Sequence, residues 1–103
     1  MQEKTTQCPV ELTLDLIGGK WKGIVLYHLL EGKKRFGELK KFMPNITQRM
    51  LTKQLRELER DGLVNRKVYK VVPPKVEYSL TKQGESLKKT ILSLEEWGKK
   101  YQK

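Results

Sequence analysis

The chain has 103 residues, enough for one domain with one modest hydrophobic core. No apolar run approaches the roughly 18 residues that a membrane span requires, and residues 1–7 lack the apolar region of a secretory signal. The single cysteine excludes an intrachain disulfide and a zinc site built from several cysteines, so we expect a soluble, cytoplasmic protein with no membrane partner, metal or other cofactor.

The charge of the chain is strongly positive and unevenly distributed. Lysine and arginine number 22 against 12 acidic residues, which gives a formal net charge of +10. Between Lys33 and Lys75 there are 13 basic residues and 4 acidic ones. A basic zone of this kind favours nucleic acid or an anionic membrane surface as a partner, although basic runs are often only solvated surface.

Two helices are predicted before the basic zone. Pro9 suits the first position of a short helix that continues to Ile17, and the following glycines can adopt the positive φ that ends a helix. A second helix is predicted from about Lys20 to Glu31, with apolar and aromatic residues at helical spacing. Its spaced residues are Trp21, Ile24, Val25, His28 and Leu29. His28, the single histidine, is interpreted as a core or rim residue.

A helix-turn-helix is predicted over residues 38–61. The short run before it, residues 33–36, can be no more than a turn or a single strand rung. Gly37 is expected to cap a helix from about Glu38 to Phe42, with Leu39 and Phe42 facing inward, and Pro44 prevents its continuation. Thr47 is expected to cap the next helix, which lasts to about Asp61. The predicted apolar face of this helix consists of Met50, Leu51, Leu55 and Leu58.

After Gly62 the apolar period changes from 3.6 to 2, which predicts a hairpin over residues 64–80 with Pro73-Pro74 at its tip. A last helix, capped by Thr81, is predicted to reach about Tyr101 with a narrow apolar seam along it. The order of elements indicates an α+β fold that is mostly α. The sequence predicts one winged helix-turn-helix domain over residues 1–103, with a dimerisation helix at each end.

The helix over residues 47–61 has a polar face that fits a major groove about 12 Å wide. Residues near its start are expected to reach base edges, which selects Gln48 and Arg49, with Thr52 one turn further on. The predicted phosphate contacts are Lys34, Arg35, Thr47, Lys53 and Arg56. The hairpin, or wing, adds Arg66, Lys67, Lys70 and Lys75. An ordinary amphipathic surface helix and a hairpin charged to protect its edge are the alternatives.

Two further features concern regulation and assembly. Cys8 precedes the first predicted helix, where unpaired N–H groups can stabilise a thiolate, so it is a candidate redox sensor; an inert, half-buried cysteine is the alternative. The seam of the last helix is longer than one small domain needs and can pair with a second subunit or cover the core of its own domain. The predicted dimer contacts are Leu87, Ile91, Leu94, Trp97 and Tyr101.

The chain resembles the HxlR family of bacterial transcription regulators. The resemblance begins at Cys8-Pro9-Val10-Glu11, ends at Val72-Pro73-Pro74-Lys75 and the residues after it, and covers residues 8–101. The runs that carry it are residues 8–11, 16–21, 35–39, 46–47, 51–64 and 72–81, with Gly84. It implies a MarR-related winged helix fold, a homodimer formed through the terminal helices and binding to palindromic operators. It also implies that some members sense electrophiles or oxidants through a cysteine at the position of Cys8.

The sequence therefore predicts a transcription regulator that binds double-stranded DNA sequence-specifically as a homodimer, with an unknown small-molecule effector. The alternative is a winged helix module for protein contact, or for binding nucleic acid without sequence preference. An enzyme is disfavoured, because the sequence has no phosphate-binding glycine loop, no metal-ligand spacing and no nucleophile beside a base.

Overall fold

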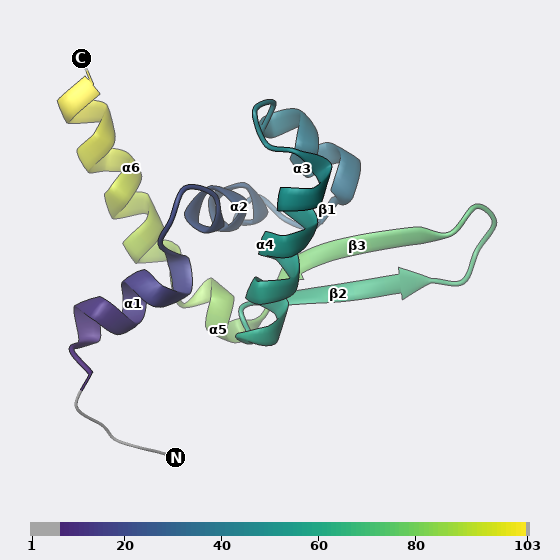
Figure 1. Cartoon of the computed structure of the whole chain (residues 1–103), viewed down its shortest axis with the longest axis horizontal. Helices are drawn as coiled ribbons and strands as arrows, with labels where there is room; N and C mark the ends of the chain where they lie inside the picture. The colour runs from purple at the N-terminus through teal and green to yellow at the C-terminus, as the bar shows by residue number, and fades with distance from the viewer. Residues whose placement is uncertain (1–6, 103) are drawn as a thin grey trace.

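The computed structural model describes residues 7–102, and its elements follow the predicted order (Figure 1). They are α1 (Pro9–Ile17), α2 (Lys22–Leu29), β1 (Lys34–Arg35), α3 (Phe36–Phe42), α4 (Gln48–Arg60), β2 (Val64–Tyr69), β3 (Lys75–Leu80), α5 (Lys82–Glu85) and α6 (Lys88–Gln102). The strands form an antiparallel sheet in the order β1-β3-β2. The fold is a winged helix-turn-helix, as predicted: α3 and α4 form the helix-turn-helix, and β2 and β3 form the wing.

The elements divide between two ends of the molecule (Figure 1). The wing extends on one side, whereas α1 and α6 lie on the opposite side and α4 crosses between them. Among the described residues, none of the helices combines the length and apolar character needed to cross a membrane.

Helix α4 begins where the sequence predicts it. The Thr47 side-chain oxygen accepts a hydrogen bond from the Met50 N–H at 3.0 Å, which satisfies one of the unpaired donors of the first turn. Leu51, Leu55 and Leu58 are buried on one face of α4, and Met50 is partly buried beside them. This face fixes the rotation of the helix, so the polar residues between the leucines are directed outward.

One hydrophobic core joins the helices to the sheet. Its largest fully buried side chains come from α2, α3, α4, the start of the wing and the turn before it. They are Leu26, Leu39, Leu51, Leu55, Leu58, Leu63, Val25 and Val64. Each such side chain stabilises the fold by about 1.5–3 kcal/mol relative to an exposed position, so the support of α4 is firm although the domain is small.

A close backbone contact joins the turn before the wing to α5. The Thr81 N–H donates to the Leu63 carbonyl at 3.1 Å, and the Thr81 hydroxyl donates to the Gly62 carbonyl at 2.6 Å. The same hydroxyl accepts from the Gly84 N–H, which confirms Thr81 as a helix cap. A Cβ atom on Gly84 would lie 2.2 Å from the Leu63 carbonyl oxygen, so only glycine allows this approach.

The predictions for the second and third helices need correction. Helix α2 is shorter than predicted, and its central buried residue is Leu26, while Ile24 is exposed. Helix α3 begins at Phe36, so Gly37 is inside the helix, and the Glu38 carboxylate accepts the Arg35 N–H at 2.8 Å. Phe42 does not face inward: it is 51% exposed. Its ring stacks on the His28 ring, with the two ring centroids 4.6 Å apart.

The predicted last helix is two helices. The Leu87 N–H donates to the Gly84 carbonyl three residues back, and the Ser86 hydroxyl donates to the Gln83 carbonyl at 2.5 Å. These local bonds replace the regular helical pattern between α5 and α6. The apolar seam is therefore not continuous from residue 80 to residue 101, and only the part on α6 lies along one helix.

Candidate nucleic-acid interface

The outward face of α4 is polar and mostly exposed. Gln48, Arg49, Lys53 and Arg56 are exposed, and Thr52 is partly buried between them. With Glu57 these residues line a shallow hollow of about 700 Å³. The structure therefore brings together the three predicted base-contact residues and two of the predicted phosphate contacts on one surface of one helix.

The acidic member of this hollow, Glu57, is held at its edge by an ion pair. The Lys22 Nζ of α2 lies 2.6 Å from the Glu57 Oε1, and the hydrogen bond from Lys22 lowers the pKa of the Glu57 carboxyl. Both side chains are partly buried. The pair fixes α4 to α2 and neutralises the negative charge that would otherwise stand beside Lys53 and Arg56.

The polar face of α4 continues onto the wing. Thr52 and Arg56 also line a second hollow, about 270 Å³, together with Arg66 of β2 and Tyr78 of β3. Arg66 and Tyr78 are direct partners in the strand ladder, and Tyr78 is buried in the core. Arg66 is thus on the face of the wing that adjoins α4.

The remaining predicted wing contacts are placed differently. Lys67 and Lys75 alternate with Arg66 and Tyr78 along their strands, so they lie on the opposite face of the wing. Lys70 is exposed just after β2. The sequence analysis treats the four basic residues of the wing as one group, but the structure places Arg66 on one face of the wing and Lys67 and Lys75 on the other.

The predicted phosphate contacts before α4 differ in their availability. Lys34 is partly buried in β1, with its Nζ 3.4 Å from the Glu31 Oε1 and 5.9 Å from the centroid of the Phe42 ring. Arg35 is exposed at the start of α3. The Thr47 side-chain oxygen accepts the capping hydrogen bond of α4, and its own O–H remains able to donate. Arg35 is thus the more accessible cation of the β1 pair.

Cys8 lies at the position that caps α1, and its side chain is exposed. Hydrogen bonds from the backbone N–H groups of Glu11 and Val10 lower the pKa of the Cys8 thiol. This position at the N-terminus of α1 is the one expected from the sequence. The backbone at the start of α1 is therefore the cause of the lowered pKa of Cys8.

Apolar side chains are exposed on α1 and α6, at the end of the molecule opposite the wing (Figure 1). Trp97 is 65% exposed and stacks on Tyr101 with ring centroids 5.1 Å apart. We define the terminal face by the exposed apolar residues Val10 and Leu14 of α1 and Leu94 and Tyr101 of α6, which line one groove, together with Trp97, which stacks on Tyr101. A large apolar surface of this kind usually marks a contact site.

Two predicted interface residues require comment. Ile91 is only 3% exposed and belongs to the core of its own domain, so it is corrected from an interface residue to a core residue. Leu87 is partly buried and packs against the same core. Ile91 lies on the inner side of α6, and Leu87, one turn before it, directly precedes that helix, so both residues face the core.

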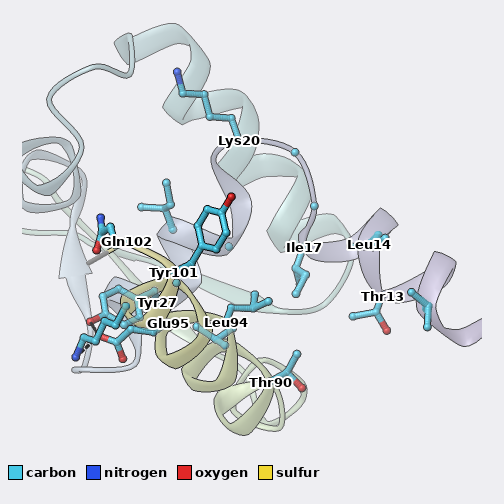
Figure 2. A pocket seen from close by; sticks show the side chains of 18 of the residues that line it. Thr13, Leu14, Ile17, Lys20, Tyr27, Thr90, Leu94, Glu95, Tyr101 and Gln102 are labelled. Atoms are coloured by element: carbon cyan, nitrogen blue, oxygen red, sulfur yellow. Dashed lines mark hydrogen bonds and ion pairs between the residues drawn. The ribbon is translucent and has the colours of Figure 1, made fainter.

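A groove of about 1040 Å³ runs between α1, α2 and α6 (Figure 2). Its apolar lining includes Leu14, Ile17 and Leu94, and Tyr27 and Glu95 lie at its side (Figure 2). The Tyr27 hydroxyl donates to the Glu95 Oε2 at 2.5 Å, which raises the pKa of Tyr27 and lowers that of Glu95. The groove is continuous with the terminal face, and the Tyr27–Glu95 bond ties α6 to α2.

Within residues 7–102 there is no group of three or more His, Cys, Asp or Glu side chains placed to hold a metal ion. His28 is partly buried between Tyr27 and Phe42, and burial lowers the pKa of its imidazole. This agrees with its interpretation as a rim residue.

Comparison with known proteins identifies the family. The HxlR-like helix-turn-helix family matches residues 16–103. The HTH-type transcriptional regulator YdeP of Bacillus subtilis is 69% identical over 94 residues, which cover 91% of this chain and 73% of that protein. This chain belongs to the HxlR-like family. It is a helix-turn-helix transcription regulator that binds DNA.

Solved structures agree with the fold of this HxlR-like regulator. The redox regulator HypR in its reduced form has a TM-score of 0.89 and 61% sequence identity, with 92% of this chain and 94% of that chain covered. In its oxidized form HypR gives a TM-score of 0.87 and 63% identity, with 90% and 96% covered. The transcriptional regulator ytcD gives a TM-score of 0.86 and 58% identity, with 92% and 97% covered.

Sequence reasoning missed the polar contacts that hold the interface of this HxlR-like regulator in place. Lys22 is at the start of α2 and Glu57 is near the end of α4, so the two residues are far apart in the chain. Tyr69 and Glu77 are on different strands and come together through the register of the wing. Each pair joins elements that are distant in the chain, so spacing within one element gives no signal. The sequence contains one usable signal, because side chains alternate between the two faces along each strand. If the strand register had been assigned from the sequence, it would have placed four residues on one face: Lys67, Tyr69, Lys75 and Glu77.

Proposed function

We propose that this regulator acts as a homodimer that binds a palindromic operator sequence-specifically in the cytoplasm, where the bacterial chromosome lies. The observation that carries the proposal is the outward face of α4, on which Gln48 and Arg49 are exposed and directed away from the core. A helix with this face, held by three buried leucines, fits the dimensions of the major groove.

Base recognition is assigned to the first turns of α4. The planar guanidinium of Arg49 can donate two hydrogen bonds to the O6 and N7 of guanine, and the amide of Gln48 can pair with N6 and N7 of adenine. Thr52 lies one turn further and can contact a base edge or the thymine methyl group. Thr47 at the start of α4 and Lys53 and Arg56 on its outward face fit phosphate contacts that set the position of the helix without reading sequence, and the exposed Arg35 at the start of α3 can add another.

The homodimer is proposed to form through the terminal face. Trp97, Tyr101 and Leu94 are exposed to water in the single chain, and burial of such side chains favours association. A two-fold axis at this end of the molecule repeats the same patch on both subunits. It places two α4 helices on one side of the duplex, where successive major grooves are about 34–36 Å apart.

Redox control is proposed through Cys8. The lowered pKa of its thiol favours the thiolate, which is the reactive form, and HypR, a relative of this chain, is a redox regulator with oxidized and reduced structures. Two Cys8 thiols from two subunits can form one disulfide when an oxidant such as diamide accepts two electrons and two protons. A change in the position of α1 would then alter the dimer and the spacing of the two α4 helices.

The test is selection of bound duplexes from a random pool, carried out with and without diamide. We expect a two-fold-symmetric consensus under reducing conditions and a change in operator affinity after diamide that is absent in the Cys8→Ser variant. Binding without any preference among duplexes would reject sequence-specific recognition and favour a module that binds nucleic acid non-specifically. A Cys8→Ser variant that responds to diamide as the wild type does would reject Cys8 as the sensor.

A further inference from the structure

The face of the wing turned away from α4 carries a cluster of charged and aromatic side chains that the DNA-binding proposal does not use. In the strand ladder Lys67 is opposite Glu77, and Tyr69 is opposite Lys75. Because side chains two residues apart in a strand share a face, these four side chains lie together. Arg35 of β1 is the partner of Glu77 on its other side, so Glu77 is at the centre of the sheet with basic residues across both ladders.

The contacts in this cluster converge on the Glu77 carboxylate, whose side chain is only 14% exposed. The Lys33 Nζ lies 3.5 Å from Oε1, and the Lys75 Nζ lies 3.8 Å from Oε2. A hydrogen bond from the Tyr69 hydroxyl is the largest of the causes that lower the pKa of the Glu77 carboxyl, followed among the lowering effects by the charge of Lys33 and Lys75. Burial acts in the opposite direction and raises this pKa.

Tyr69 extends the cluster to a second lysine. The Lys75 Nζ is 4.5 Å from the centroid of the Tyr69 ring, and the Lys67 Nζ is 4.9 Å from it. Both distances are within the range of a cation–π interaction. One phenol ring thus has two ammonium groups beside it, and the hydroxyl of the same side chain is close enough to Glu77 to lower the pKa of that carboxyl.

One oxygen of the Glu77 carboxylate accepts no hydrogen bond from the described residues. This oxygen, Oε1, is inaccessible to water, although the Lys33 ammonium is nearby. A buried carboxylate oxygen is costly unless positive charge compensates it, so the lysines around Glu77 are strongly attracted to it. This attraction competes with any external anion, such as a phosphate, for the same ammonium groups.

We infer that Glu77 is a positioning residue that holds Tyr69 and Lys75 on the face of the wing turned away from α4. Arg66, on the face that adjoins α4, and Lys70, near the tip, are then the wing cations that contact DNA. This inference rests on the proposed binding of DNA and on the wing contacts predicted from the sequence, and it divides the four predicted wing contacts into two pairs with different roles. Lys67 and Lys75 stiffen the hairpin, and Arg66 and Lys70 bind phosphate.

The first test measures how affinity for a labelled duplex of arbitrary sequence depends on KCl concentration. Each phosphate contact contributes about −0.9 to the slope of log affinity against log salt. We expect Arg66→Met to make the slope shallower by about 0.9. Lys75→Met should leave the slope unchanged, as should the control Lys89→Met, which removes an exposed lysine from α6. A Lys75→Met variant with the same loss of slope as Arg66→Met would overturn the inference.

The second test removes the central charge. Glu77→Gln keeps the shape of the side chain and releases Lys75, so we expect the salt slope to become steeper by about 0.9 and affinity for the arbitrary duplex to rise about fivefold. Glu85→Gln is the matched control, because it removes an exposed acid from α5 and changes the net charge equally. If Glu77→Gln and Glu85→Gln change the salt slope and the affinity by the same amounts, the positioning role of Glu77 is overturned.

The third test needs no DNA. Carboxyl ¹³C NMR titration of the whole protein should give a pKa for Glu77 below the ordinary glutamate value, and Tyr69→Phe, which keeps the ring but removes the hydroxyl, should raise it. An unchanged Glu77 pKa in Tyr69→Phe would overturn the cluster itself. If the wild-type protein binds no duplex at any salt concentration, DNA binding by the wing fails as a proposal, while this titration still decides whether Glu77 is held by Tyr69.

Discussion

At the scale of single residues, Arg49 is the most direct test of how α4 meets DNA. Its side chain is exposed in the first turn of α4, next to the capping residue Thr47. We expect Arg49→Ala to lower the affinity for the selected operator by about 1–3 kcal/mol, because the proposed bidentate contact of Arg49 to guanine would be lost. The preference at one base position of each half-site should also relax. Competition binding against operators changed at each position measures both effects.

Arg60→Ala is the matched control for Arg49→Ala. It removes the same charge from the last turn of the same helix, where the Arg60 Nε lies 3.2 Å from the Asp61 Oδ1. A loss through long-range charge alone is shared by all sequences, so the base preferences of Arg60→Ala should match those of the wild type. Identical preference profiles for the two variants would mean that the first turn of α4 does not face the bases.

Individual residues also show where sequence reasoning succeeds. The cap of α4 and its three buried leucines were predictable, because the side-chain chemistry of Thr47 and a period of 3.6 act within one helix. Phe42 was misplaced because its position depends on His28, a residue of another helix that offers a ring to stack on. The role of Glu77 was not visible either, since it depends on the register of the wing and on Lys33 from the loop before β1.

At the scale of elements, the Lys22–Glu57 pair is expected to fix the position of α4 relative to α2. Glu57→Gln should lower the melting temperature by a few degrees near neutral pH, because Lys22 then loses its partner in a site where its own side chain is only 13% exposed. Thermal unfolding followed by circular dichroism measures the effect. Glu96→Gln is the control: its pair with Lys100 is exposed on α6 and should contribute almost nothing.

The same pair has a defined pH dependence. Lys22 lowers the pKa of Glu57 in the folded protein, so the pair stabilises the fold at pH values above the unfolded pKa of about 4.3. This stabilisation is lost as the pH falls through the lower, folded pKa. The difference in melting temperature between wild type and Glu57→Gln should therefore shrink in acid and vanish below the folded pKa. A difference that stays constant through this range would show that the carboxylate charge is not the cause.

The elements differ in how far sequence predicts them. Local signals located the helix starts at Thr47 and Thr81 and the two strands of the wing. The division between α5 and α6 was missed, because bonds from Ser86 and Leu87 to the preceding turn interrupt an otherwise helical pattern. That division has a functional consequence: α5 stays with the wing through Gly84, while α6 can be positioned by the terminal face.

At the scale of the whole molecule, the two ends have complementary roles in the proposed dimer. The wing and the outward face of α4 carry exposed basic side chains, and the terminal face carries exposed apolar ones. The helices α1 and α6 that form the terminal face lie at the end of the molecule opposite the wing (Figure 1). A single winged domain reads one half-site, so the affinity for a palindrome depends on the covalent or non-covalent link between two domains. The basic surface and the apolar surface are at different ends of the molecule, so one subunit can contact DNA and its partner subunit at the same time.

We therefore expect Trp97→Glu to convert the protein to a monomer in sedimentation velocity experiments at micromolar concentration. The substitution introduces a charge beside Tyr101 and Leu94 and removes the largest exposed apolar side chain of the terminal face. Affinity for the full palindrome should fall at least about tenfold, because the second domain no longer binds at high effective concentration, while affinity for an isolated half-site stays unchanged. Val72→Glu, at the fully exposed tip of the wing, is the control for adding a charge at an apolar surface site and should remain a dimer. A Trp97→Glu protein that still sediments as a dimer would move the subunit contact away from α6, and a monomer with full palindrome affinity would separate operator binding from dimerisation.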